Sequence, residues 1–176
     1  MSIKRVEEHL RRVAAHPGRY AHADTPPQPS QKLAIITCMD CRIDLFDLLG
    51  LYVGDAHVIR NAGGIVTEDV ERSLVLSQHL LGTEDIIVMQ HTQCGLLAAT
   101  DEQIDAELER DTGQRPPWRA RTFADLEDSV RISVGKLHAS PFVDTHGDIR
   151  GLIYDVETGE LRELTRTGSL DDEPAA

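Results

Sequence analysis

The chain has 176 residues, enough for one domain with a hydrophobic core, and a formal net charge of −12. Its 18 Lys and Arg residues are scattered among 30 acidic ones, which argues against a protein that binds nucleic acid or an anionic membrane surface. No apolar run approaches the roughly 20 residues that span a bilayer, and the N-terminus lacks the apolar core of a signal peptide. We therefore expect a cytoplasmic protein without a membrane segment.

Apolar side chains near the N-terminus recur with helical spacing, and charged residues occupy the other faces. These apolar residues are Ile3, Val6, Leu10 and Val13. The pattern predicts an amphipathic helix whose apolar stripe packs on its own domain or on a neighbouring subunit. A Pro-rich connector follows it at residues 24–30.

The chain divides by composition into three parts. Residues 1–30 form the predicted helical arm and Pro-rich connector, and residues 31–165 form the predicted zinc-binding α/β catalytic domain. Residues 166–176 are rich in acidic and small residues, and we expect them to be a disordered tail.

Strand and helix patterns alternate along the main domain. After a first strand over residues 33–36, we predict a helix over 43–49, a strand over 56–60, a helix from Thr67 to Gly82 and a strand over 85–90. A helix over 101–110 follows, and then a long helix that has Thr122 and Asp125 as its cap and ends before Pro141. The last elements are a strand over 151–156 and an edge strand over 160–164. This order predicts an α/β fold: a mainly parallel four-stranded sheet with an antiparallel edge strand, flanked by helices.

Two of the predicted strands end in groups that bind metals. Cys38 follows the first strand, and His91 and Cys94 follow the strand over residues 85–90. The carboxyl ends of parallel strands meet at one edge of a sheet, where open α/β folds place their ligands. A single Cys at a strand end is more often a small buried apolar residue, but two Cys and one His are ligands that zinc prefers, and three of them leave one position open. The odd number of cysteines, three, also suits metal or thiol chemistry better than a disulfide scaffold.

Three motifs in this order resemble the β-class carbonic anhydrases, especially a short bacterial subgroup with relatives that hydrolyse carbonyl sulfide. The motifs are Cys38-x-Asp40-x-Arg42, the Arg-Asn-Ala-Gly-Gly run at residues 60–64, and His91-x-x-Cys94-Gly95. The resemblance covers roughly residues 33–156. It implies a β-carbonic anhydrase-like fold, a Zn²⁺ cofactor and a dimer or tetramer with active sites near a dimer interface. An N-terminal arm of this family commonly embraces the other protomer.

Asp40 and Arg42 are the candidate catalytic pair. Two thiolates cancel the charge of a zinc ion and leave a bound water less acidic, so that a nearby acceptor is useful. Asp40 can accept a hydrogen bond from that water, and an Arg42 partner favours its ionised form. Such a pair is usually a surface ion pair, but its place beside a predicted ligand favours function. The resembled family also has a closed state with the Asp on the metal, and the sequence leaves both states open.

The predicted reaction is the reversible hydration of carbon dioxide to bicarbonate by attack of zinc hydroxide. Hydrolysis of carbonyl sulfide or carbon disulfide by the same zinc site is the alternative among enzymes. A non-catalytic zinc- or anion-binding protein is an alternative of another class. The spacing Cys38-x-x-Cys41 also permits a thiol oxidoreductase, although that interpretation leaves His91, Cys94 and Arg42 unexplained.

Three glycines and one histidine are further candidate site residues. Gly63, Gly64 and Gly95 could present backbone N–H groups to a substrate or another small anion, although the paired glycines could equally make a turn. His57 is a candidate for a proton shuttle.

The resembled family also has a glutamine from the neighbouring subunit in its pocket. Gln28 and Gln31 are both possible counterparts here, and neither matches securely.

Overall fold

The computed structural model describes residues 3–15 and 22–165, so the predicted acidic tail lies outside the described residues. The helices are α1 (Ile3–Ala14), α2 (Leu45–Leu49), α3 (Glu68–Leu81), α4 (Asp101–Thr112) and α5 (Leu126–Ala139), with 3₁₀ turns η1 (Ala62–Gly64) and η2 (Gly95–Leu97). The strands are β1 (Leu33–Cys38), β2 (Ala56–Asn61), β3 (Asp85–His91), β4 (Ile149–Tyr154) and β5 (Leu161–Thr165). Within the described residues, no helix combines the length and apolarity needed to cross a membrane.

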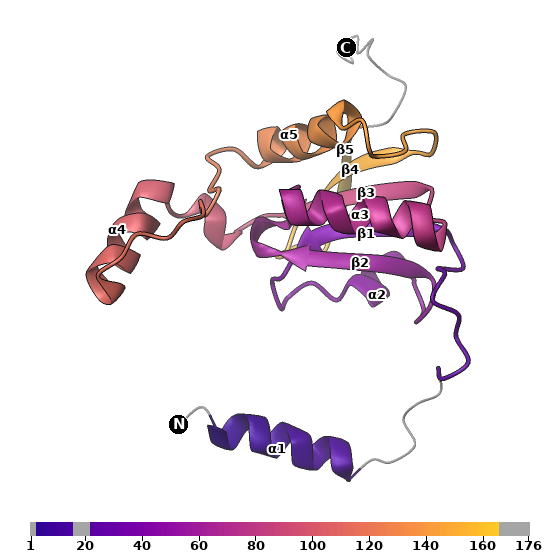
Figure 1. The fold of residues 1–176 in the computed structure, drawn as a ribbon, viewed down its shortest axis with the longest axis horizontal. Coiled ribbons are helices and arrows are strands. Elements are labelled where there is room, and N and C mark those ends of the chain that lie inside the picture. Colours follow the sequence, from indigo (N-terminus) through magenta and orange to yellow (C-terminus); the bar gives the residue numbers. More distant parts are fainter. Residues whose placement is uncertain (1–2, 16–21, 166–176) are drawn as a thin grey trace.

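The five strands form one sheet in the order β2-β1-β3-β4-β5 (Figure 1). β1 pairs in parallel with β2 and β3, β3 pairs in parallel with β4, and β5 pairs antiparallel with β4. This arrangement confirms the predicted α/β fold, with four parallel strands and an antiparallel edge strand. β2 is the other edge of the sheet.

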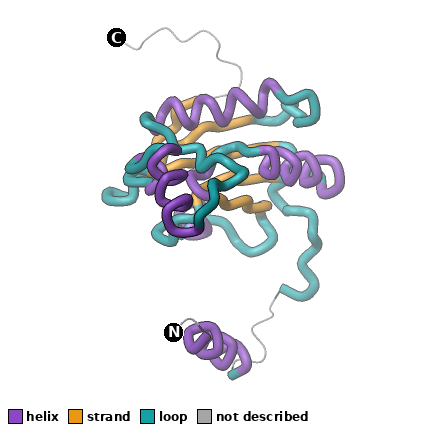
Figure 2. The backbone as a smooth tube through the Cα atoms, turned by 60° about the vertical axis from the view of Figure 1, so that its left-hand side comes forward, coloured by secondary structure: helices purple, strands orange, loops and turns teal. Residues whose placement is uncertain are grey.

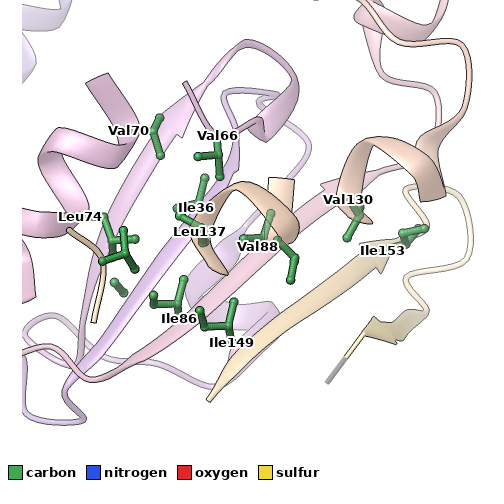
Figure 3. Packing of buried hydrophobic residues seen from close by; sticks show 13 residues of the cluster. Ile36, Val66, Val70, Leu74, Ile86, Val88, Val130, Leu137, Ile149 and Ile153 are labelled. Carbon is green, nitrogen blue, oxygen red and sulfur yellow. The ribbon is translucent and has the colours of Figure 1, made fainter. Parts of the chain in front are cut away.

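The central strands are buried on both faces, which explains why they read as continuous apolar runs. On one face, Ile36 and Val88 pack against Leu74 of α3 and against Val130 and Leu137 of α5 (Figure 3). α2 packs against the opposite face, in a second cluster that contains Ile35, Met89, Leu45 and both Cys38 and Cys94. The candidate ligands therefore lie at the margin of a packed core.

The helix ends follow local sequence signals. Thr67 caps α3 by accepting a hydrogen bond from the backbone N–H of Val70, and Gly82 ends this helix in the left-handed conformation. Asp125 caps α5. Thr122, predicted as part of this cap together with Asp125, does not cap the helix, because its hydroxyl and backbone N–H both donate to the carboxylate of Asp101 at the start of α4.

Helix α1 lies apart from the α/β body in both views (Figures 1 and 2). Its apolar side chains remain exposed, by 57% for Val6, 62% for Leu10 and 72% for Val13. The predicted amphipathic helix is confirmed, but its apolar stripe packs on nothing in its own α/β body.

The buried Leu74 gives a direct test of the core. Because its side chain is fully buried between α3 and the sheet, Leu74→Ala should lower the free energy of unfolding by about 2–5 kcal/mol. Urea unfolding followed by circular dichroism measures this change. Val53→Ala, at a side chain that is 55% exposed, is the matched control and should cost less than about 0.5 kcal/mol. Equal effects of the two substitutions would contradict this description of the core.

Candidate metal centre

The parallel register brings the three predicted ligands together. Cys38 is the last residue of β1, His91 is the last residue of the neighbouring strand β3, and Cys94 follows one short turn later. Their ligand atoms all lie within 4.8 Å of one another, and all three residues are buried. Among the described residues, this is the one group of His, Cys, Asp and Glu side chains that meets the spacing of a metal site.

The imidazole of His91 is oriented as a metal ligand. Its Nδ1 lies 2.9 Å from the carbonyl oxygen of Thr92, so Nδ1 carries the proton and donates it to that oxygen. Nε2 is then left with its lone pair, and it is buried without a hydrogen-bond partner. A buried nitrogen without a partner is unfavourable unless something binds it. A metal ion held together with the two sulfur atoms would satisfy it.

The two thiols lie in contact and shift each other's pKa values in opposite directions. A hydrogen bond from Cys94 lowers the pKa of Cys38 to about 4, and backbone N–H groups, among them that of Gly63, also stabilise its thiolate. The same contact with Cys38 raises the pKa of Cys94 above its usual value, together with burial. Burial opposes a charge on His91, but Cys38, the Thr92 carbonyl and the Asp40 carboxylate together raise the pKa of the imidazole above its usual value. Metal binding must therefore displace protons.

Asp40 lies between the candidate ligands and Arg42. Its Oδ1 accepts from Nε of Arg42 at 2.9 Å and from the Arg42 backbone N–H at 2.9 Å, and its Oδ2 accepts from Nη2 at 2.8 Å. These bonds hold the pKa of Asp40 well below its usual range, so it is a carboxylate at neutral pH. Oδ2 also lies 3.8 Å from Nε2 of His91. The carboxylate is thus paired with Arg42 and close to the position that faces the ligands.

Arg42 has a second partner that the sequence analysis missed. Its Nη1 donates to the side-chain Oε1 of Gln93 at 3.2 Å, and its Nη2 donates to the Gln93 backbone oxygen at 3.1 Å. Gln93 lies between His91 and Cys94 in the chain. The position of Gln93 inside the His-x-x-Cys motif indicated that its side chain lies near the site, but the sequence did not indicate that its partner is Arg42.

Arg60 was also missed as an individual site residue. It extends from β2 and donates to the backbone oxygens of Cys38 at 2.8 Å and Asp40 at 2.7 Å, with a longer bond of 3.4 Å to Ile43. A planar guanidinium with several donors can bind several carbonyl groups at once. Arg60 therefore holds the loop that carries both a candidate ligand and the candidate catalytic pair.

The paired glycines pack against this loop. Gly64 has a φ of +63°, and a Cβ there would lie 2.7 Å from the backbone nitrogen of Cys38. A Cβ on Gly63 would lie 2.8 Å from Leu96. Only glycine permits the approach of Gly64 to the backbone, and the φ of +81° at Gly63 also favours glycine, so both positions have a structural role. Gly95 has open space around its Cα. Anion binding by these three glycines stays a prediction.

Other candidate residues lie away from the three ligands. His57 is at the amino end of β2, paired with Ala34 rather than Cys38, where its Nε2 donates to the Pro27 oxygen at 2.9 Å and its Nδ1 accepts from Ser77 at 2.7 Å. Both ring nitrogens are occupied, which does not support a shuttle role.

The remaining candidates are all exposed on the surface of this chain. Cys41 is exposed, unlike Cys38 and Cys94. Gln28 and Gln31 are exposed on the connector. None of these side chains belongs to the group of candidate ligands.

A buried Cys-His-Cys group at the carboxyl ends of parallel strands defines an α/β protein with a metal centre, and comparison with known proteins identifies the family. The carbonic anhydrase family model matches residues 33–161. β-Carbonic anhydrase 1 of Mycobacterium tuberculosis is 46% identical over 140 residues, which cover 80% of this chain and 86% of the relative. The chain belongs to the β-carbonic anhydrase family.

Two further similarities refine this placement. A crystal structure of carbonic anhydrase from Streptococcus mutans has a TM-score of 0.85 and 40% identity, and the match covers 91% of this chain and 97% of that one. Carbon disulfide hydrolase of Acidithiobacillus thiooxidans is 33% identical over 154 residues, with 76% of this chain and 77% of the relative covered. The family therefore includes relatives named for two different substrates.

Proton release offers a test of the metal centre. The Cys94 thiol must lose its proton to bind a metal, so the apparent dissociation constant for zinc should rise by at least about tenfold for each unit of decrease in pH below neutrality. Competition with a chromophoric chelator at several pH values measures it. Cys41→Ser should leave the affinity unchanged, whereas Cys94→Ser should weaken it strongly. An affinity independent of pH would contradict the assignment of Cys94.

Proposed function

We propose that this protein catalyses the zinc-dependent reversible hydration of carbon dioxide to bicarbonate. The observation that carries the proposal is the buried Cys-His-Cys group with an unpartnered His91 Nε2, placed beside an Asp40 carboxylate that Arg42 keeps ionised. Similarity to a protein named β-carbonic anhydrase 1 at 46% identity supports the same reaction.

Zinc fits the donor set better than the other common metals. Cys38, His91 and Cys94 supply two sulfur atoms and one nitrogen, whereas calcium and magnesium prefer oxygen ligands. Three protein ligands leave a position for water or substrate, as in catalytic zinc sites. A zinc ion bound there would act as a Lewis acid that lowers the pKa of a water ligand.

Asp40 would act as the proton acceptor for the attacking water in this reaction. As a carboxylate it can accept a hydrogen bond from the attacking water, orient it towards the carbon atom of the substrate and receive its proton. Arg42 supports this role in two ways, because its charge keeps Asp40 ionised and its bidentate contact fixes the direction of the carboxylate. The Asp40 side chain is 18% exposed, so the proton can pass to solvent without a further side chain.

Hydrolysis of carbon disulfide or carbonyl sulfide is the second candidate. The observation in its favour is the 33% identity with a protein named carbon disulfide hydrolase. These substrates are linear and electrophilic at carbon, as carbon dioxide is, so the same groups of this chain could serve. The higher identity with a protein named carbonic anhydrase favours carbon dioxide.

The substitution Asp40→Ala tests the reaction and the role of Asp40 together. Stopped-flow measurements with zinc-loaded protein should show rapid hydration of carbon dioxide and a loss of about 10²-fold or more in kcat/KM in the variant. Asp69→Asn, on the exposed first turn of α3, is a control that should retain the activity. Parallel assays with carbonyl sulfide and carbon disulfide distinguish the candidates. Stronger release of sulfide than hydration of carbon dioxide would contradict the proposal.

We also propose that the protein forms a homodimer through α1 and the edge of the sheet. The exposed stripe of Val6, Leu10 and Val13 has no partner on its own α/β body. At the β2 edge, α3 exposes Leu76 by 41% and Leu80 by 69% over a groove that β2 and α3 line together. A second copy supplies both apolar surfaces with a partner of the same kind.

The substitution Leu10→Asp tests this assembly. Light scattering after size-exclusion chromatography should give about twice the chain mass of 19.5 kDa for the unmodified protein and a value near 19.5 kDa for the variant. His9→Asp introduces the same side chain beside this stripe and should leave the assembly intact. A monomeric unmodified protein, or an unchanged mass in Leu10→Asp, would contradict the proposed interface.

A further inference from the structure

We propose that Gln93 is a positioning residue that fixes Arg42, and through Arg42 the carboxylate of Asp40, relative to the metal ligands. The consequence for catalysis rests on the function proposed above. The positional role itself belongs to the chain and can be measured in metal-free protein.

The guanidinium of Arg42 is held on two sides. Nε and Nη2 donate to the two oxygens of Asp40 at 2.9 and 2.8 Å. Nη1 donates to Oε1 of Gln93 at 3.2 Å, and Nη2 also donates to the Gln93 backbone oxygen at 3.1 Å. All three guanidinium nitrogens therefore have an acceptor, and Gln93 provides the only one that Nη1 uses among the contacts of the described residues.

The hydrogen bonds between Arg42 and Asp40 do not by themselves fix the position of these two side chains relative to the metal ligands. Asp40 and Arg42 are two residues apart in the same irregular segment between β1 and α2, so their mutual contact orients them only relative to each other. The side chain of Arg42 is also 43% exposed, which leaves it free to move with its partner. Gln93, in contrast, lies on the turn that joins His91 to Cys94. Its two bonds connect the pair to the segment that carries two of the three ligands.

The Asp40 carboxylate lies only slightly closer to Arg42 than to His91. Asp40 Oδ2 is 2.8 Å from Arg42 and 3.8 Å from Nε2 of His91. A small displacement of Arg42 would change whether the carboxylate remains with the guanidinium or moves towards the position that His91 faces. An acceptor on the far side of Arg42 therefore stabilises the arrangement in which Asp40 is directed to Arg42.

The backbone at Gln93 provides an independent observation. Its φ is +55°, a conformation that favours glycine and disfavours residues with a side chain. A glycine would meet the needs of the turn at lower conformational cost. The presence of a glutamine there is explained by its side-chain oxygen, which accepts from Arg42, and is not explained by the turn alone.

Metal-free protein labelled with ¹⁵N at arginine tests the positional role by NMR. In the unmodified protein, the two terminal nitrogens of Arg42 should give separate signals because rotation of the guanidinium is restricted; Arg42→Lys identifies these signals by removing them. Gln93→Met and Gln93→Gly should both raise the rate at which the two signals exchange, since both remove the acceptor of Nη1 and leave only the bonds to Asp40 and to the Gln93 backbone oxygen. Gln93→Glu keeps a side-chain acceptor and should retain the slow exchange of the unmodified protein.

The glycine variant separates positioning from a role in the turn. Gly relieves the left-handed φ and retains the backbone oxygen, so it preserves the turn and lacks only the side-chain bond. An exchange rate of the Arg42 signals equal to that of the unmodified protein, in Gln93→Gly or in Gln93→Met, would overturn the proposal.

Zinc-loaded protein provides the second measurement. Gln93→Met and Gln93→Gly should each lower kcat/KM for carbon dioxide by about two- to fivefold, the size expected for an exposed, charge-assisted contact. Gln93→Glu should lie closer to the unmodified protein than either. Full activity in Gln93→Gly would overturn the catalytic part of the inference. An unmodified protein without hydration activity would refute the proposed function, and the NMR result would still decide the role of Gln93.

Discussion

The parallel pairing of β1 with β3 is the constraint on which the site depends. It places Cys38 and His91 at the same edge of the sheet, and the short turn after β3 returns Cys94 to them. Because both strands are buried in a packed core, their ends have little freedom, and the core holds the candidate ligands close together. The unfavourable burial of the unpartnered His91 Nε2 follows from this arrangement and is relieved when a metal binds.

The contacts around the loop after β1 show how one segment supports both binding and catalysis. Arg60 holds this loop through its backbone oxygens, and Gly64 permits the close approach that a side chain would prevent. On the outer side of the same loop, Asp40 pairs with Arg42, and Gln93 holds Arg42 from the turn that carries Cys94. The candidate ligands and the candidate proton acceptor Asp40 are thus connected by backbone hydrogen bonds and by the guanidinium of Arg42.

Residue patterns predicted most of the fold, because each signal was local. The ends of α3 at Thr67 and Gly82 and the apolar strands required no knowledge of distant contacts. The grouping of the ligands was also predictable from strand order. Contacts between distant segments were not predictable from the sequence. Thr122 donates to Asp101 and does not cap α5 as expected. Gln93 contacts Arg42 from a left-handed turn that the spacing of residues does not indicate. The shuttle role of His57 was suggested by its residue type alone, and its contacts with Pro27 and Ser77 do not support that role.

X-ray absorption at the zinc edge tests the central claim, that Cys38, His91 and Cys94 together bind zinc. The protein should bind one zinc ion per chain, with two sulfur ligands at about 2.3 Å and the remaining ligands nitrogen or oxygen at about 2.0–2.2 Å. Cys94→Ser should reduce the sulfur count to one, and Cys41→Ser should leave it at two. A third sulfur ligand that disappears in Cys41→Ser, or a zinc ion without sulfur ligands, would contradict the account.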